Sequence, residues 1–198
     1  MSLKQKTVSG LFWSFIDDFA KLGITFVSGI ILARLLTPRE YGLIGMTTIF
    51  IAISQSFIDS GFRQALIRKG DCTQADYSTV FYFNLFVSFI FYLLLFVFAG
   101  TIGQFFKEPK LPAIIRVLGM GLIINALTLV QQTQLIKDIN FRLQTRISVI
   151  SAIISGIIGI TMAYTGYGVW SLVATTLSGS FVTMLLLWLW RKWRPSLL

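Results

Sequence analysis

The sequence predicts an all-α fold, a polytopic membrane bundle of about six transmembrane helices. Of its 198 residues, 55% are hydrophobic and only 13% are charged, whereas a soluble domain carries roughly 25% charged residues. The mean hydropathy is +0.77, and the apolar residues form runs of the roughly 20 residues that a helix needs to cross a bilayer. A soluble fold of this size could not cover its surface with so few charges, so we expect an integral membrane protein.

Short polar breaks divide the chain into its expected membrane spans. Each span is an apolar run with turn or cap residues at its ends, and an arrangement of about six helices uses every break. We expect residues 1–198 to form a single six-helix membrane domain. The expected helices cover about residues 11–34, 42–62, 79–102, 113–136, 145–165 and 168–190.

The breaks carry residues that begin and end helices. "TPRE" (Thr37 to Glu40) has the form of a capping box, and Pro38 suits the first helical position. "TQAD" (Thr73 to Asp76) is a cap of similar type before the third span. "TGYG" (Thr165 to Gly168) predicts a tight turn before the last span. Each boundary therefore has a local chemical cause as well as a change in hydropathy.

The lysine and arginine residues predict the orientation in the membrane. Cytoplasmic loops carry an excess of these residues, and the excess lies on the side that holds both chain ends. We therefore expect both termini in the cytoplasm, which accounts for the net charge of +9 without a nucleic-acid partner. The residues expected inside are Lys4, Lys6, Arg63, Arg68, Lys69, Lys137, Arg142, Arg146, Arg191, Lys192 and Arg194, and those expected outside are Arg34, Arg39, Lys107, Lys110 and Arg116.

The composition excludes several kinds of chemistry. Cys72 is the single cysteine, so the chain can form neither an intrachain disulfide nor a CxxC metal site. The absence of histidine excludes histidine-based catalysis and ordinary zinc ligation. The acidic residues of the loops are scattered, which argues against a membrane enzyme that acts on polyprenyl phosphates. We expect no catalytic residue, no metal, no cofactor and no enzyme activity.

The first span contains three ionisable residues in the stretch "SFIDDFAKLG". Asp17 and Lys21 are four residues apart, so they share a helical face, while Asp18 points about 100° away from Asp17. An ionised residue near the bilayer centre costs roughly 2.5–3.5 kcal/mol on insertion scales. One interpretation is structural, with a pair between Asp17 and Lys21 and a neighbouring helix for Asp18. We favour the other, in which this helix lines a hydrated cavity that meets an ion or a charged substrate.

A second group of charges surrounds the end of the second span, in "IDSGFRQALIRKGD". Asp59 and Arg63 are four residues apart, and Arg68 and Lys69 follow. The plainer interpretation is anchoring at the cytoplasmic membrane surface. The alternative is that Arg63 and Arg68 receive an anionic head group, because the guanidinium fork suits phosphate oxygens.

Small and polar residues recur at helical spacing in the later spans. Ser151, Ser155, Gly159 and Ala163 repeat every four residues, a spacing that lets helix backbones approach closely. We expect this row to pack helices, with a substrate-facing role as the alternative. A parallel row contains Ser148, Ala152 and Gly156, and we expect Asn84 and Asn125 to link helices within the bundle.

Three stretches together resemble a known family. They are "ILARLLTPREYGLIGM", "FIDSGFRQALIRKGDCTQADYSTVFYFNL" and "GYGVWSLV". They are similar to the Wzx-type polysaccharide flippases of the multidrug/oligosaccharidyl-lipid/polysaccharide transporter superfamily, in the colanic-acid-type branch. The resemblance extends over essentially the whole chain.

The resemblance implies a fold and a function that composition does not. It implies two lobes of six or more helices around a central cavity, and alternating access. The implied substrate is an undecaprenyl-diphosphate-linked oligosaccharide, moved across the bacterial inner membrane for exopolysaccharide or lipopolysaccharide biosynthesis, with its tail in membrane lipid. The implied roles are substrate binding for Lys21, Arg63 and Arg68, and ion coupling or gating for the carboxylates, which are Asp17, Asp18 and Asp59.

The six spans of this sequence resemble the N-terminal lobe only. We therefore expect transport to need a second lobe or a second copy, and polysaccharide-assembly proteins are further possible partners. Two other functions stay open from the sequence. One is a drug or cation antiporter of the same superfamily, which membrane acids without basic partners would favour. The other is a non-transporting membrane subunit of a polysaccharide-assembly complex.

Overall fold

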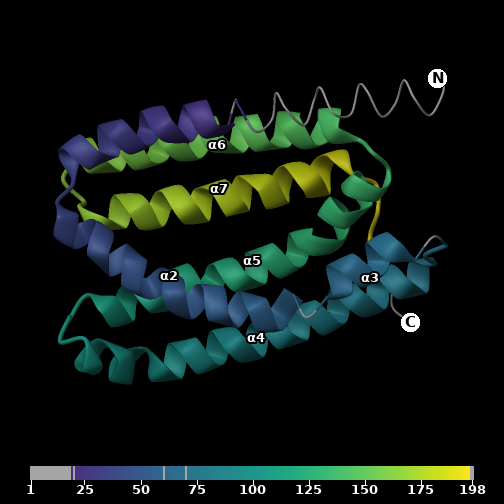
Figure 1. The fold of residues 1–198 in the computed structure, drawn as a ribbon, viewed down its shortest axis with the longest axis horizontal. Coiled ribbons are helices and arrows are strands. Elements are labelled where there is room, and N and C mark those ends of the chain that lie inside the picture. Colours follow the sequence, from purple (N-terminus) through teal and green to yellow (C-terminus); the bar gives the residue numbers. More distant parts are fainter. Residues whose placement is uncertain (1–18, 20, 60, 70, 197–198) are drawn as a thin grey trace.

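The computed structural model describes residues 19, 21–59, 61–69 and 71–196. This part of the chain consists of helices and turns without a strand, which confirms the all-α fold class. Residues 21–35 are helical and are termed the first helix. The later helices are α2 (Pro38–Asp59), α3 (Phe62–Arg68), α4 (Gln74–Phe105), α5 (Leu111–Lys137), α6 (Phe141–Tyr164) and α7 (Val169–Trp190) (Figure 1).

Within the described residues, five helical segments are long and apolar enough to cross a membrane. They are α4, α5, α6, α7 and a segment from Pro38 to Arg68 that takes α2 and α3 together. The chain is therefore a multi-pass membrane protein. The expected third and fourth spans lie inside α4 and α5, and the last two match α6 and α7 within four residues at each end.

The second span is the one whose boundary differs from the prediction. We expected a continuous helix to residue 62, but α2 ends at Asp59 and α3 begins at Phe62. Gly61 between them has φ of 79°, a left-handed conformation that glycine adopts without steric cost. The break places Arg63 and Arg68 on a short separate helix that packs against α4 and α5.

The two predicted caps form, one of them completely. The Thr73 hydroxyl accepts a hydrogen bond from the Asp76 backbone N–H, and the Asp76 carboxylate accepts one from the Thr73 N–H at 2.8 Å. At the start of α2, the Glu40 carboxylate accepts a hydrogen bond from the Thr37 N–H at 2.7 Å, but the Glu40 N–H donates to the Thr37 carbonyl rather than to its hydroxyl. Pro38 begins α2, as predicted.

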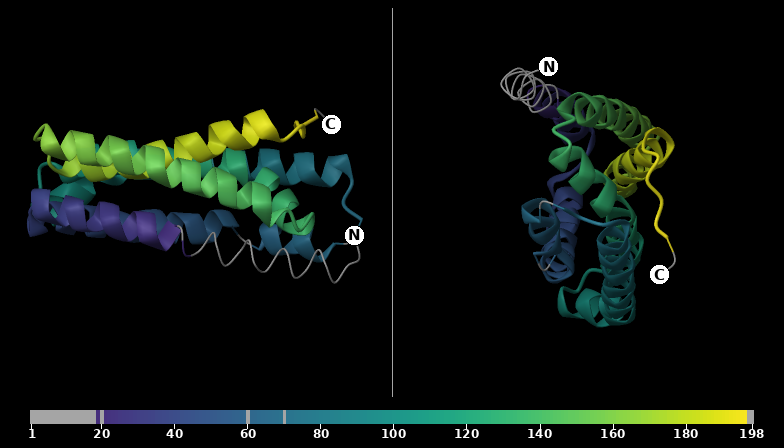
Figure 2. Two further views of the ribbon diagram at one scale, coloured as in Figure 1. Left: turned by 90° about the horizontal axis from the view of Figure 1, so that it is seen from above. Right: turned by 90° about the vertical axis from the view of Figure 1, so that its right-hand side faces the viewer.

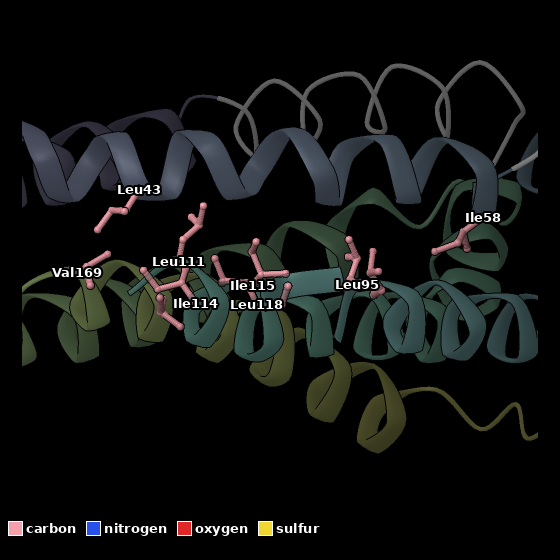
Figure 3. Close-up of a cluster of buried hydrophobic side chains, with 11 residues drawn as sticks. Leu43, Ile58, Leu95, Leu111, Ile114, Ile115, Leu118 and Val169 are labelled. Carbon is pink, nitrogen blue, oxygen red and sulfur yellow. The ribbon is translucent and has the colours of Figure 1, made fainter. Parts of the chain in front are cut away.

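Helix α5 lies at the centre of the bundle. It packs against α4 and α7 most extensively, and also against α2, α3 and α6. Its Leu111, Ile114 and Ile115 are fully buried in the main apolar core. Figure 3 shows these side chains facing Leu43 and Val169, which come from α2 and α7. The core therefore lies between α2, α4, α5 and α7.

The first helix, α6 and α7 form a second group of helices. The first helix runs parallel to α6 and lies beside it in both figures (Figures 1 and 2). Leu32, Leu36, Ala163 and Leu172 form a small apolar cluster that joins the three helices. Helices α6 and α7 approach closely at Gly159, where an added Cβ atom would overlap the Thr175 hydroxyl of α7. The packing role that the sequence predicted for Gly159 and Ala163 is confirmed.

One end of the bundle, termed the basic end, is formed by α3, the starts of α4 and α6, and the ends of α5 and α7 (Figure 1). Lys69 Nζ donates a hydrogen bond to Asp76 at 2.8 Å, which raises the pKa of Lys69 and keeps it charged. Arg191 pairs with Asp138 at 3.0 Å, and Trp193 Nε1 donates to Gln74 Oε1 at 2.7 Å. These contacts tie the chain after α7 to α4 and α5.

Candidate functional site

Two contiguous cavities lie between the first helix, α5, α6 and α7. The smaller, termed the pocket, has a volume of about 180 Å³, and the larger, termed the polar groove, about 450 Å³. They share four lining residues, which are Lys21, Gln132, Ser148 and Thr183. The pocket also contains Arg63, Leu135, Ile136, Gln144, Ile147 and Leu187, and the polar groove also contains Thr25, Asn125, Thr128, Ser151, Ala152, Ser155, Thr176, Gly179 and Ser180.

Lys21 contributes the positive charge of the first helix to both cavities. It is half-buried, and it lies in the first described turn of that helix. Thr25, one turn later, lines the polar groove on the same face. The structure thus places Lys21 at two cavities, while its role in substrate binding stays a prediction. Asp17 and Asp18 lie outside the described residues.

Arg63 brings a second positive charge to the pocket from α3. Its Nε is buried and has no hydrogen-bond partner among the described residues. A buried donor without a partner costs about 1–3 kcal/mol, and more when it belongs to a charged group. Since this atom is buried, an anion in the pocket would meet the rest of the Arg63 side chain, whose guanidinium fork suits phosphate oxygens.

The other predicted charges lie outside the two cavities. Asp59 is the last residue of α2 and accepts a hydrogen bond from Gln55 Nε2 at 3.1 Å. Arg68 is exposed at the end of α3. The structure thus places Lys21 and Arg63 in one pocket and leaves Asp59 and Arg68 apart from it.

The walls of the polar groove are rows of hydroxyl and amide side chains at helical spacing. On α5, Asn125, Thr128 and Gln132 follow each other at intervals of three and four residues, so they share one face. Across the groove, Thr183 donates a hydrogen bond to Ser151 at 2.9 Å. The remaining wall residues on α6 and α7 are Ser148, Ser155, Thr176 and Ser180.

Several of these wall residues went unrecognised in the sequence. The signal that would have found them is the spacing of Thr176, Ser180 and Thr183 on α7, which matches one helical face. The small-residue row of α6 also borders this groove, because Ser151 and Ser155 line it. Asn125, expected to link helices, is instead exposed to the groove.

The site contains hydrogen-bonding groups and positive charge but no cluster of metal ligands. Across the described residues, no group of three or more cysteine and acidic side chains lies close enough together to hold a metal ion. The arrangement is therefore suited to binding an anion and a polyol. Its described lining residues offer hydrogen bonds and two positive charges.

Comparison with known proteins identifies the family. The profile of a polysaccharide biosynthesis protein family matches residues 31–198. The chain belongs to this family. The resemblance drawn from "LARLLTPREYG" and "GYGVWSLV" is confirmed at this level, although no solved structure matches the chain.

Curated relatives of this family are longer than the chain. Rhizobium meliloti ExoT, a "succinoglycan biosynthesis transport protein", is 26% identical over 92% of the chain and 37% of its own length. Escherichia coli WzxC, a "lipopolysaccharide biosynthesis protein", is 25% identical over 63% of the chain and 25% of its own length. Bacillus subtilis TuaB, a "teichuronic acid biosynthesis protein", is 26% identical over 78% of the chain and 32% of its own length. The chain therefore spans between a quarter and about two-fifths of these relatives.

Proposed function

We propose that the chain forms a membrane lobe of a flippase that moves an undecaprenyl-diphosphate-linked oligosaccharide across the bacterial inner membrane. Its family and the transport role in the name of the relative ExoT support this. The single observation that carries the proposal is the pocket, which two cationic side chains, Lys21 and Arg63, line together. A diphosphate fits this pocket by charge and by hydrogen bonding.

The mechanism requires no bond to be made or broken. The guanidinium of Arg63 and the ammonium of Lys21 hold the diphosphate, and the hydroxyl and amide rows of the polar groove accept and donate hydrogen bonds to the sugar. Moving a charged head group through hydrocarbon alone is prohibitively costly. A continuous polar wall lowers this cost, because it replaces water around the head group while the tail stays in lipid.

The orientation and partners follow from the same reasoning. The basic end faces the cytoplasm by the positive-inside rule, so both termini are cytoplasmic. Arg68, exposed at this end, is the first contact for an arriving head group. A second lobe or a second copy of the chain closes the open side of the polar groove, and polysaccharide-assembly proteins supply the substrate. Asp17, Asp18 and Asp59 couple transport to an ion gradient or gate the cavity.

The proposal is tested by lipid binding to the chain in nanodiscs. We expect Lys21→Gln and Arg63→Gln each to weaken binding of the sugar lipid about ten- to a hundredfold, since a hydrogen bond to a charged group is worth about 1.5–3 kcal/mol. Arg116→Gln is the control, because Arg116 is exposed on α5, lies 4.7 Å from the Phe96 ring centroid and lines neither cavity. Equal effects of all three changes contradict the proposal, and binding of a lipophilic cation in place of the sugar lipid indicates an antiporter.

A further inference from the structure

An apolar groove runs along the outside of the contact between the first helix and α6. It has a volume of about 330 Å³ and is lined mainly by Gly23, Ile24 and Val27 on the first helix, and by Ile153, Gly156 and Ile157 on α6. Successive residues of a helix are about 100° apart. Gly23 and Val27 therefore point away from Lys21, and Ile153 and Ile157 point away from Ser148, which lines the polar groove. Ile24, three residues after Lys21, lies at the boundary between the polar groove and the apolar groove.

The apolar groove begins beside the charged pocket. Gly23 comes two residues after Lys21, an axial distance of about 3 Å. Because the first helix and α6 run in the same direction (Figure 1), the groove extends from the level of Lys21 toward the end of the bundle opposite the basic end. Its length along α6, from Ile153 to Ile160, is about 10 Å. It can hold the first part of a long chain and leave the rest in the bilayer.

The floor of the groove is open because of its glycines. A Cβ atom on Gly23 would have no other atom within 4 Å, so the space above this residue is free. Gly156 lies at the seam between the helices, where a Cβ would stand 2.8 Å from Ser28 Oγ. Branched aliphatic side chains, including Ile24, Ile153 and Ile157, form the walls. The groove is a shallow, open apolar depression between the two helices.

We propose that this apolar groove holds the head-proximal part of the hydrocarbon tail of the same lipid whose diphosphate lies in the pocket. The inference rests on the proposed function. Any lipid chain can enter an apolar groove, but a tail whose head group is already bound at Lys21 is held within a few ångströms of the groove entrance. Its effective concentration there is therefore raised by the tether alone. The gain is modest, since bulk lipid is as apolar as the walls.

Photo-crosslinking in nanodiscs tests where the tail lies. The probe is an undecaprenyl-diphosphate sugar with a diazirine on the isoprene unit next to the diphosphate. We expect its adducts on Ile24, Ile153 and Ile157, with few on the exposed α4 residues Phe86 and Phe89. A phospholipid with a diazirine in its acyl chain should label both regions alike. If the phospholipid labels the groove residues as strongly as the sugar-lipid probe does, the tail site is overturned.

A matched pair of substitutions tests the groove by filling it. Gly23→Leu puts a side chain into the apolar groove. Gly29→Leu is the control, because Gly29 lies on the same helix but does not line the groove. At both residues no other atom lies within 4 Å of the position of an added Cβ atom. Both replace glycine in a helix, so both gain helix propensity equally. We expect Gly23→Leu to weaken binding of the long-tailed lipid about three- to tenfold. Binding of a tail-less sugar diphosphate should be unchanged.

The outcomes separate this inference from the proposed function. Equal effects of Gly23→Leu and Gly29→Leu overturn the tail site. The tail site is also overturned if the wild-type chain binds the tail-less sugar diphosphate, if Lys21→Gln weakens this binding, and if the diazirine probe forms no adduct in the groove. In that case the proposed function stands. If neither ligand binds the wild-type chain, the proposed function fails and the tail site fails with it.

Discussion

The two halves of the bundle are held together in different ways. Between α2, α4 and α5, large aliphatic side chains such as Leu111, Ile115 and Leu122 are fully buried against one another. Between the first helix, α6 and α7, glycine and hydroxyl residues bring the helices close, and two polar cavities remain at the side that faces α5. In lipid, apolar burial drives helix association weakly, and packing and hydrogen bonds replace it. The first half therefore contains the main apolar core, and the second borders the cavities in which we propose that the ligand binds.

The largest effect should come from removing volume from the half that contains the main apolar core. Leu122→Ala deletes a side chain with 0% exposure, so we expect the free energy of unfolding in detergent micelles to fall by about 2–5 kcal/mol. Leu93→Ala is the control, because Leu93 on α4 is 52% exposed. A fall in the free energy of unfolding as large for Leu93→Ala as for Leu122→Ala would show that burial in the core does not stabilise this half.

A smaller effect should come from adding volume to the half that borders the cavities. Gly159→Leu forces a side chain into Thr175, whose Cβ is 3.1 Å from the position of the new Cβ atom. We expect destabilisation of about 1–3 kcal/mol, measured by thermal unfolding in detergent. Gly100→Leu on α4 serves as the comparison, since no atom lies within 4 Å of a Cβ there. Tolerance of leucine at Gly159 would argue against a close seam between α6 and α7.

The smallest effect should come from the hydrogen bond across the polar groove. Thr183→Val and Ser151→Ala each remove one partner of the 2.9 Å contact between these hydroxyls. A double-mutant cycle should give a coupling energy of about 0.6 kcal/mol, the average for such bonds in membranes. The fold is expected to persist in both variants, because packing rather than this bond joins α6 to α7. A coupling energy several times larger would mean that the polar wall itself holds the helices.

The sequence predicted the helices and their caps because those signals are local. Pro38 and the pair of Thr73 and Asp76 act within one turn, so no knowledge of neighbouring helices is needed. The break at Gly61 was missed because hydropathy continues through it, although a glycine before a polar stretch is a recognised local signal.

The face that each polar residue presents could not be read from the sequence. A threonine in a membrane helix can satisfy itself, as Thr176 does by donating to the Leu172 carbonyl at 3.0 Å, so its presence does not reveal a cavity. Lys21 was identified because an intramembrane charge needs an explanation wherever it lies. Arg63 was identified because a guanidinium at the cytoplasmic membrane surface suits an anionic head group. That they share one pocket depends on α3 packing against α5, which is a tertiary contact between segments distant in the sequence.

The left-handed backbone at Gly61 makes the two cations of the pocket mechanically unequal. Lys21 belongs to a long helix fixed along its length to α6, whereas Arg63 lies in the first turn of a seven-residue helix whose N-cap is that glycine. Rotation about the Gly61 torsions swings Arg63 while Ile58 stays seated in the core. The spacing of the two charges, and with it the size of anion that would fit between them, therefore depends on the backbone conformation at Gly61.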